Sequence, residues 1–455
     1  MSGVGWLLER MRETPGNQAV IADGSGMRYG ALLDRVSFWK EWLRSKQLGS
    51  GDVIALNADY SPDGIAILLA LLDALAIVLL LPPTISAETA ESYRIAEAKA
   101  AIQINGNGTA REVMFGSVVS HPLLRALADK SSPGLILMSS GSTGKPKASL
   151  HDAGRFLEKF QRPRAALRAV AVPPMDHVAG LDTLMYCLSS SAAVVCIQDR
   201  EPATVCRAIE SQKVQLLPAS AAFLNLLLMS GAYRSHDLSS LQLVAYGSDV
   251  MPQPTLDRLK EILPNTAFVQ KYGTTELGSP RTRTREDGSL WVKIDDEGYE
   301  TKIVDGTLWI RARSAMLGYL NARDPFDEEG WINTEDGVEA DGEYVRFLGR
   351  TSDLINVGGQ KIYPTEVENV LMHMDNVSDV LVFGSPNAIM GHVVGARFRL
   401  INDERYGDFK RRVRTFCKER LVSYKVPVVI EVTYSPLISS RQKKIRSSTV
   451  FDAHA

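Results

Sequence analysis

The alternation of apolar, strand-like runs with amphipathic helical stretches between about residues 53 and 269 most constrains the fold of this chain. Runs typical of buried parallel strands occupy residues 53–57, 76–81, 134–138, 169–172, 193–197, 214–217 and 241–245. Helices are expected between them, for example over residues 203–212 and 252–262. This order predicts an α/β fold with mostly parallel sheets, whose ligands bind at loops after the carboxyl ends of the strands.

A change of texture after about residue 290 predicts further structural units. Short strands over residues 290–294, 299–304 and 307–311 are separated by turns rich in Asp and Gly, which favours an antiparallel β subdomain at about 285–349. A helix over 364–374, a strand over 377–383 and a helix over 406–421 are expected next. A chain of 455 residues is long enough for more than one domain. We therefore expect a large, multi-layered N-terminal domain at 1–349 and a small α+β domain at 350–455.

Charge and apolar patterning argue against two kinds of partner. The formal net charge is −2, so no broad basic surface indicates nucleic-acid binding. The apolar stretch at 65–81 is interrupted by Asp73 and followed by two prolines, so we interpret it as a helix to about Leu75 and a buried strand from Ala76, and not as a membrane span. The N-terminus lacks the pattern of a signal peptide, and the four cysteines lack the spacing of a metal site or a disulfide framework. These observations predict reduced thiols and a cytoplasmic location.

The loop after the strand at 134–138 carries the strongest functional signal. Residues 139–147 read SSGSTGKPK, with four hydroxyls, two glycines and two lysines. Glycine allows the backbone to approach a ligand closely, while successive N–H groups, hydroxyls and the charges of Lys145 and Lys147 can surround an anion. Pro146 disfavours a helix directly after Lys145, which distinguishes this loop from the nucleotide P-loop. We expect a polyphosphate ligand; the alternative is a Ser/Gly turn without function.

Further motifs occur in order along the rest of the chain. They are residues 173–180 (PPMDHVAG), 246–248 (YGS), 272–276 (YGTTE), 331–336 (WINTED), 348–350 (LGR), 355–362 (INVGGQKI) and 440–446 (SRQKKIR). In 272–276, hydroxyls beside the carboxylate of Glu276 can hold phosphate and a divalent metal together. Through these motifs, from about residue 30 to 446, the chain resembles the adenylate-forming superfamily, which includes acyl-CoA synthetases, nonribosomal-peptide adenylation domains and luciferases.

The resemblance implies an ATP site and an adjoining acid site. Asp336 would accept hydrogen bonds from both ribose hydroxyls, Arg350 would contact ribose or phosphate, and Glu276 would meet Mg²⁺. His177 would line and gate the acid pocket. The nucleotide-binding residues implied are Ser139, Ser140, Gly141, Ser142, Thr143, Gly144, Lys145, Lys147, Gly247, Ser248, Tyr272, Gly273, Thr274, Thr275, Asp336 and Arg350. The acid-binding residues implied are His177, Tyr246, Gly247 and Gly273, and the catalytic ones are Lys444, Glu276, Thr143 and His177.

The resemblance also implies that the C-terminal domain is a mobile lid. Lys444 corresponds to the family's catalytic lysine, but Lys443 stands where the family has glycine, so the assignment is open between these two lysines. Ser352 takes the hinge position, which is usually Asp or Lys; a hinge needs only to absorb a backbone rotation. Glu335 stands where glycine is usual in the ribose-binding motif. The residues implied on the acceptor side are Gly358, Gly359 and Lys361.

The reaction implied by the resemblance is the activation of a carboxylic acid by ATP. The acid becomes an acyl-adenylate, and a thiol acceptor, either CoA or the phosphopantetheine of a carrier protein, then takes the acyl group. Residues 175–177 lack the pattern of amino-acid-activating members, so we expect a non-amino, largely apolar small-molecule acid. Residues 424–427 (YKVP) are similar to an element of CoA-using members. Two alternatives stay open: a stand-alone ligase that passes the acyl group to an amine or amino acid, and a non-catalytic relative that binds acyl-nucleotides.

Overall fold

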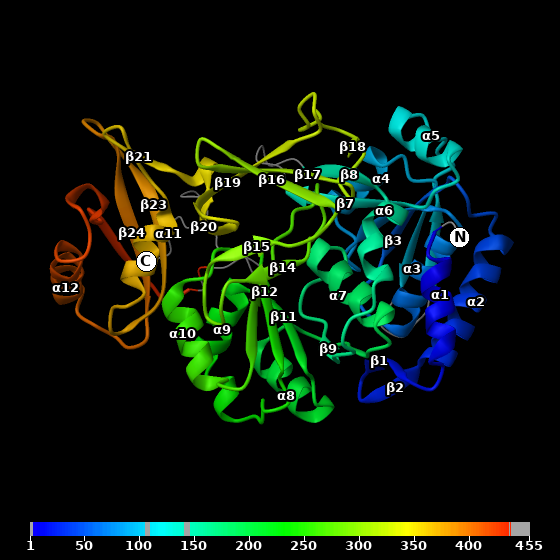
Figure 1. The fold of residues 1–455 in the computed structure, drawn as a ribbon, viewed down its shortest axis with the longest axis horizontal. Coiled ribbons are helices and arrows are strands. Elements are labelled where there is room, and N and C mark those ends of the chain that lie inside the picture. Colours follow the sequence, from blue (N-terminus) through cyan, green and yellow to red (C-terminus); the bar gives the residue numbers. More distant parts are fainter. Residues whose placement is uncertain (1–2, 105–109, 141–145, 436, 438–455) are drawn as a thin grey trace.

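The computed structural model describes residues 3–104, 110–140, 146–435 and 437, whose strands form four β-sheets (Figure 1). The N-terminal helices lie at one end of the molecule, and the last sheet lies at the other end with helices α11 (Pro364–Leu371) and α12 (Tyr406–Lys418). The predicted class is confirmed: an α/β protein with a large, layered N-terminal part and a smaller C-terminal part. The domain boundary at residue 350 stays a prediction.

The first large sheet has the order β18-β8-β7-β4-β3-β5-β6. Its strands are β3 (Val53–Asn57), β4 (Ile77–Leu81), β5 (Ala100–Ile104), β6 (Ala110–Met114), β7 (Gly134–Ser140), β8 (Pro146–Asp152) and β18 (Gly318–Tyr319). The inner strands β5, β3, β4 and β7 run parallel, whereas β6, β8 and β18 pair antiparallel at the two edges. Because β8 returns directly beside β7, with Ser139 opposite Lys147, a strand and not a helix follows the predicted phosphate loop.

The helices before and around this sheet are α1 (Gly5–Glu13), α2 (Tyr29–Ser45), α3 (Pro62–Asp73), α4 (Ala87–Ile95), α5 (Pro122–Asp129) and α6 (Ala153–Leu157). The start of α3 is defined by Ser61, whose hydroxyl accepts the Gly64 N–H at 3.0 Å, and by Pro62 in the first turn. Residues 63–72 of α3 are all buried. The apolar run at 65–81 is therefore a core helix and a core strand, as predicted, although the helix ends at Asp73.

Within the described part of the chain, no helix is both long and apolar enough to cross a membrane.

The second large sheet has the order β13-β12-β11-β9-β10-β1-β2. Its strands are β1 (Gln18–Ala22), β2 (Ser25–Arg28), β9 (Ala169–Val170), β10 (Val194–Val195), β11 (Leu216–Ser220), β12 (Leu243–Gly247) and β13 (Ala267–Gln270). Only β2 pairs antiparallel with its neighbour among these strands. The flanking helices are α7 (Val178–Ser189), α8 (Pro202–Gln212), α9 (Ala221–Ser230) and α10 (Gln253–Ile262).

Several predicted strand bounds in this sheet are wrong. The runs at 169–172 and 193–197 form ladders of only two residues each, while the strands expected at 214–217 and 241–245 begin and end later in the chain. The physical reason is that apolar runs report burial, whereas strand bounds depend on which backbone groups find a partner in the next strand.

The third sheet is wholly antiparallel, with the order β14-β15-β20-β19-β17-β16. Its strands are β14 (Thr282–Thr284), β15 (Val292–Ile294), β16 (Tyr299–Val304), β17 (Thr307–Ala312), β19 (Ile332–Asp341) and β20 (Tyr344–Arg350). The predicted antiparallel character is therefore found in the structure, and the sheet begins slightly earlier than residue 285.

The fourth sheet forms the C-terminal part and has the order β22-β21-β24-β23, and β25 pairs with β24 outside this linear order. Its strands are β21 (Ile355–Val357), β22 (Gln360–Ile362), β23 (Val377–Asn387), β24 (Gly391–Leu400) and β25 (Val429–Thr433). Both predicted helices are shorter than expected, ending at Leu371 and Lys418, and the strand predicted at 377–383 continues to Asn387. This part touches the second sheet's helices where Asn225 Nδ2 donates to Ser378 O at 3.4 Å.

Candidate active site

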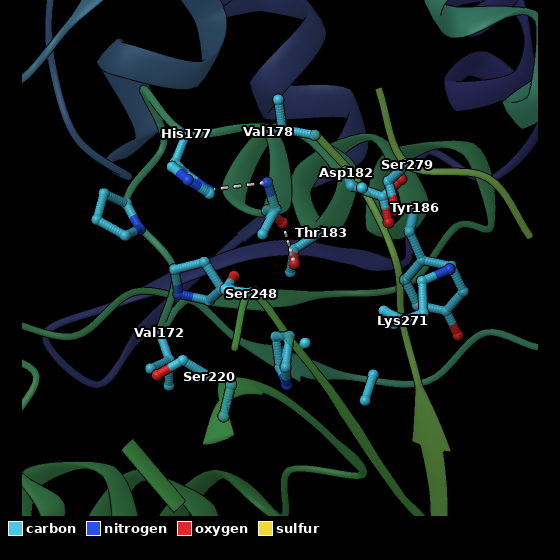
Figure 2. Close-up of a pocket in the computed structure, with 18 of the residues that line it drawn as sticks. Val172, His177, Val178, Asp182, Thr183, Tyr186, Ser220, Ser248, Lys271 and Ser279 are labelled. Carbon is cyan, nitrogen blue, oxygen red and sulfur yellow. Dashed lines mark hydrogen bonds between the residues drawn. The ribbon is translucent and has the colours of Figure 1, made fainter. Parts of the chain in front are cut away.

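A cavity of about 600 Å³ lies where the carboxyl ends of β11, β12 and β13 meet the start of α7 (Figure 2). The three strands are parallel neighbours, so their last residues emerge at one edge of the sheet. The sequence-predicted residues in the cavity wall are Ser139, His177, Gly247, Ser248, Tyr272, Gly273 and Thr275. Motifs that lie far apart in the sequence therefore meet at one site.

His177 is held at the cavity by the first turn of α7. It is the N-cap residue of this helix, and its Nδ1 accepts the Ala179 N–H at 3.3 Å (Figure 2). The preceding loop packs so tightly on Gly180 that an added Cβ there would lie 1.8 Å from Pro174 O. Glycine at this position lets the loop cross the helix closely and fixes where His177 enters the wall.

The end of β12 divides its side chains between the cavity and the core. Ala245 and Gly247 line the cavity, whereas Tyr246, between them, is fully buried in the core cluster on the opposite face of the sheet. A Cβ on Gly247 would lie 2.6 Å from the carbonyl oxygen of Lys271. The structure thus places the Tyr246 side chain outside the cavity wall, because strand alternation turns the ring away, and its contact with the acid stays a prediction.

A hydrogen-bonded group of three side chains lies beside the cavity. Tyr272 Oη donates to Asp336 Oδ2 at 2.8 Å, and Arg350 Nε lies 2.9 Å from Asp336 Oδ1. The pairing of β19 with β20 sets Asp336 directly opposite Arg350, and the Tyr272 ring stacks on Phe347 with centroids 4.8 Å apart. Burial raises the pKa of Asp336, although the charge of Arg350 opposes this effect. The sequence named these three polar residues, and the structure brings them together.

Glu276 is positioned by a tyrosine that the sequence reasoning missed. Tyr319 Oη donates to Glu276 Oε1 at 2.6 Å, and Lys147 Nζ lies 5.2 Å from the centroid of the Tyr319 ring. Tyr319 belongs to β18, an edge strand of only two residues, so no strand pattern marked it. In the described part of the chain, no three or more His, Cys, Asp or Glu side chains are arranged to hold a metal ion. Glu276 fits Mg²⁺ only together with the phosphate oxygens of a nucleotide, which is a common way of binding this ion.

His151 is a second residue that the sequence reasoning missed. It is fully buried on β8, its Nε2 donates to Thr275 O at 2.8 Å, and its ring packs edge-to-face on Phe156 at 5.0 Å. Burial lowers the pKa of His151 to about 4, so the imidazole is neutral at pH 7. Through this hydrogen bond, the neutral His151 side chain fixes the position of the main chain of the 272–276 motif.

Some of the predicted residues lie outside the described part of the chain. These include five residues of the loop, Gly141, Ser142, Thr143, Gly144 and Lys145, and the two lysines Lys443 and Lys444. Ser352 lies in a short 3₁₀ turn, Thr351–Asp353, between β20 and β21. Thr274 closes a tight turn with Gly278, in which the two N–H···O bonds measure 3.1 and 3.0 Å. The roles predicted for all of these residues stay predictions.

The predicted acceptor segment lies away from the cavity in this structure. Gly358 and Gly359, with φ values of +56° and +88°, form the exposed tip between β21 and β22, and Lys361 is also exposed. The side chain of Asn356 accepts the Gly359 N–H at 2.9 Å and so stabilises this turn. None of the three predicted acceptor residues lines the cavity.

The chain matches two family models. Residues 7–320 match the AMP-binding enzyme family, and residues 366–443 match the AMP-binding enzyme C-terminal domain. The chain therefore belongs to the AMP-binding enzymes, which confirms the predicted adenylate-forming superfamily.

Named relatives agree with this assignment. A feruloyl-CoA synthase of Amycolatopsis sp is 26% identical over an alignment of 473 positions, which covers 94% of each chain. A methyl-dioxo-octahydroindenyl-propanoyl:CoA ligase of Rhodococcus jostii (strain RHA1) is 28% identical over 311 residues, or 64% of this chain. The match spans 60% of the length of that relative. Among solved structures, an anthranilate CoA ligase in complex with anthranoyl-AMP shares the fold with a TM-score of 0.84, at 20% identity, over 98% of this chain and 95% of that one.

Proposed function

We propose that this protein activates a carboxylic acid with ATP and transfers the acyl group to CoA. The observation that carries the proposal is the junction of an acid-sized cavity of about 600 Å³ with the Tyr272–Asp336–Arg350 group. The cavity can accept an organic acid, and the Tyr272–Asp336–Arg350 group beside it can accept a ribose. Acyl-adenylate formation needs these two sites next to each other. The CoA-ligase activities of the named relatives support the choice of reaction.

In the first step a carboxylate oxygen attacks the α-phosphorus of ATP, and the bond to the bridging oxygen of pyrophosphate breaks. No proton transfer is required. The protein's task is to align two anions and to offset the charge that develops. Asp336 holds the ribose, and the loop at 139–147 holds the terminal phosphates. Mg²⁺ bound with the nucleotide, near Glu276, would supply further positive charge at the phosphates.

In the second step the thiol of CoA loses its proton to solvent, its sulfur attacks the acyl carbon, and AMP leaves as the bond between the acyl carbon and the phosphate oxygen breaks. We propose that the C-terminal part rotates about Ser352 between the steps, so that the tip at Gly358–Gly359 faces the cavity. That tip is exposed in the present arrangement, which therefore corresponds to a stage before transfer in this scheme.

The acid is proposed to have an apolar body. The apolar part of the cavity wall includes Val172, Pro173, Pro174, Leu216, Pro218, Ala245 and Val269. Such a wall removes apolar surface from water and favours hydrocarbon or aromatic groups.

The test is ATP–pyrophosphate exchange with a panel of aryl, alkyl and amino acids. Acids that support exchange are then offered CoA, a pantetheinylated carrier protein or amines, and the products are identified by mass. Exchange followed by an acyl-CoA product is expected. An amide product would favour the amine ligase, and exchange with none of the acids would favour a non-catalytic acyl-nucleotide binder.

A further inference from the structure

The side of the cavity opposite His177 carries charged side chains that the proposed reaction does not use. Figure 2 shows Asp182, Tyr186, Lys271 and Ser279 grouped on this side. Lys271 follows β13, Asp182 lies on α7, and Arg164 and Arg281 come from adjoining loops. We call Arg164, Asp182, Lys271 and Arg281 the distal cluster.

Asp182, the one acidic member of the distal cluster, already has a partner. Lys159 donates to Asp182 and to Ser279 O, and the side chains of Lys159 and Asp182 are only 11% and 17% exposed. Burial by itself raises the pKa of Asp182, but Lys159 and the cations of the cluster outweigh it and hold the pKa below its ordinary value. Asp182 is therefore an ionised, paired carboxylate and is poorly suited to bind a substrate ammonium.

The cationic members of the distal cluster lack hydrogen-bond acceptors for some of their N–H groups. Lys271 Nζ makes one hydrogen bond among the described residues, to Pro280 O at 3.3 Å. Arg164 Nη2 and Arg281 Nε are buried and have no hydrogen-bond partner in the part of the chain that the structure describes, although Arg281 Nη2 donates to Lys159 O at 3.0 Å. Burial lowers the pKa of Lys271 to about 8, against the opposing pull of Asp182.

The local charges do not balance. The local cations are Lys159, Arg162, Arg164, Lys271 and Arg281, and the carboxylates that face them are Asp182, Asp296 and Glu297. Glu297 is already paired with Arg162 at 2.6 Å, so two carboxylates remain for the other four cations. A cation elsewhere in the wall shows the contrast, because Arg200 lies 2.7 Å from Asp59 and also donates to Val172 O at 2.8 Å. Partly buried positive charge that nearby carboxylates do not offset in full is costly, and an anion that enters through the cavity would relieve that cost.

We propose that Lys271, Arg164 and Arg281 form a subsite for a second carboxylate on the acid substrate, at the end remote from the carboxylate that is activated. This inference rests on the proposed function and narrows its substrate class to acids whose apolar body ends in a second anionic group. The apolar wall accepts the body of the acid, and the distal cluster selects its far end.

The test is calorimetric binding of two triads of acids to the full-length protein. Each triad contains a monoacid, the corresponding diacid and the diacid's methyl ester at the remote carboxylate. The aromatic triad is 3-phenylpropanoate, 3-(4-carboxyphenyl)propanoate and the methyl ester of its ring carboxylate. The aliphatic triad is octanoate, suberate and monomethyl suberate. Each ester matches the shape of its diacid without the second charge. The diacid should bind roughly 10- to 100-fold more tightly than its ester in at least one triad, the range for a hydrogen bond between charged groups.

Variants of Lys271 locate the effect. Lys271→Met keeps the length of the side chain and should remove most of the preference for the diacid, while Lys271→Arg should retain it. Lys260→Met is the matched control, because Lys260 pairs with Asp287 outside the cavity wall. It should leave both affinities unchanged.

Equal, weaker or undetectable binding of the diacid in both triads would overturn the subsite, as would a Lys271→Met protein that keeps the full preference. Pyrophosphate exchange separates this result from the proposed reaction. If only monoacids support exchange, the reaction stands and the subsite fails. If the diacid binds more tightly than its ester but no acid supports exchange, the subsite stands and the reaction fails.

Discussion

Tyr272 and Asp336 are joined by a hydrogen bond of 2.8 Å between residues that lie 64 positions apart in the sequence. The bond links the end of the second parallel sheet to the antiparallel subdomain, and Arg350 holds the other oxygen of the carboxylate at 2.9 Å. Asp336 is thus oriented from two sides. The side chain is only 15% exposed, which strengthens any hydrogen bond it accepts.

Replacing Tyr272 by Phe should weaken nucleotide binding without unfolding the site. The stack on Phe347 is kept, but the hydrogen bond to Asp336 is lost, so KM for ATP should rise by about tenfold in pyrophosphate exchange. Tyr344→Phe, on β20 away from the cavity wall, is the control and should change nothing. An unchanged KM for ATP in the Tyr272 variant would show that the bond does not position the carboxylate.

The predicted role of Lys444 gives a test of the two steps. Lys444→Ala should lower adenylate formation by about 100-fold or more, because a positive charge at the reacting carboxylate and α-phosphate is lost. Transfer from a supplied acyl-adenylate to CoA should be spared. Lys443→Ala, measured in parallel, decides which of the two lysines promotes adenylate formation. An equal loss of both steps in the Lys444 variant would contradict the proposed rotation of the C-terminal part between the steps.

His151 should make the stability of the protein depend on pH. Its pKa is lowered from 6.5 to about 4 in the folded state, so the unfolded chain binds more protons between these values. The free energy of unfolding should therefore fall as pH decreases from 6.5 to about 4, by about 3 kcal/mol at most for this group. Denaturant unfolding across this range measures it. His151→Phe should show a shallower dependence, and an identical slope in the two proteins would refute the assignment.

Gly180 and Gly407 offer a matched pair of glycine substitutions. A Cβ at Gly180 meets Pro174 O at 1.8 Å, so Gly180→Ala should lower the free energy of unfolding by about 1–3 kcal/mol and displace His177. Gly407 lies in α12 with nothing within 4 Å of its added Cβ, so Gly407→Ala should be neutral or stabilise by up to about 1 kcal/mol. Thermal unfolding compares them; similar effects in both would contradict the packing described.

If Lys271 binds a second carboxylate, activity should depend on its proton. Its pKa of about 8 in the free protein is set by burial, by Asp182 and Asp296, which raise it, and by Lys159 and Arg164, which lower it. The charged form is lost as pH rises through this value, so kcat/KM for a diacid should decline above about pH 8. For the matching monoester the profile should stay flat in this range. Lys271→Arg should move the decline to higher pH, and the same decline for both substrates would exclude Lys271 as its source.

The sequence by itself determined the fold class, the family and the polar motifs around the nucleotide, because each is encoded in a short stretch. Strand and helix periodicity is local, and so is the composition of the loop at 139–147 or of residues 272–276. Tyr272, Asp336 and Arg350 could be named because the short motifs that contain them resemble those of the family. Strand bounds and the orientation of Tyr246 could not, because they depend on which neighbouring strand supplies hydrogen bonds and which face packs.

Only the tertiary structure shows which side chains contact these motifs and which charges line the far side of the cavity. The hydrogen bond of His151 to Thr275 joins residues 124 positions apart, and that of Tyr319 to Glu276 joins residues 43 positions apart. The charges of the distal cluster come from separate loops, a helix and a strand end, and each looks like an ordinary surface residue in the sequence. Chain folding brings these charges together and partly removes them from water, and this loss of solvent is what would let a scattered set of charges select a ligand.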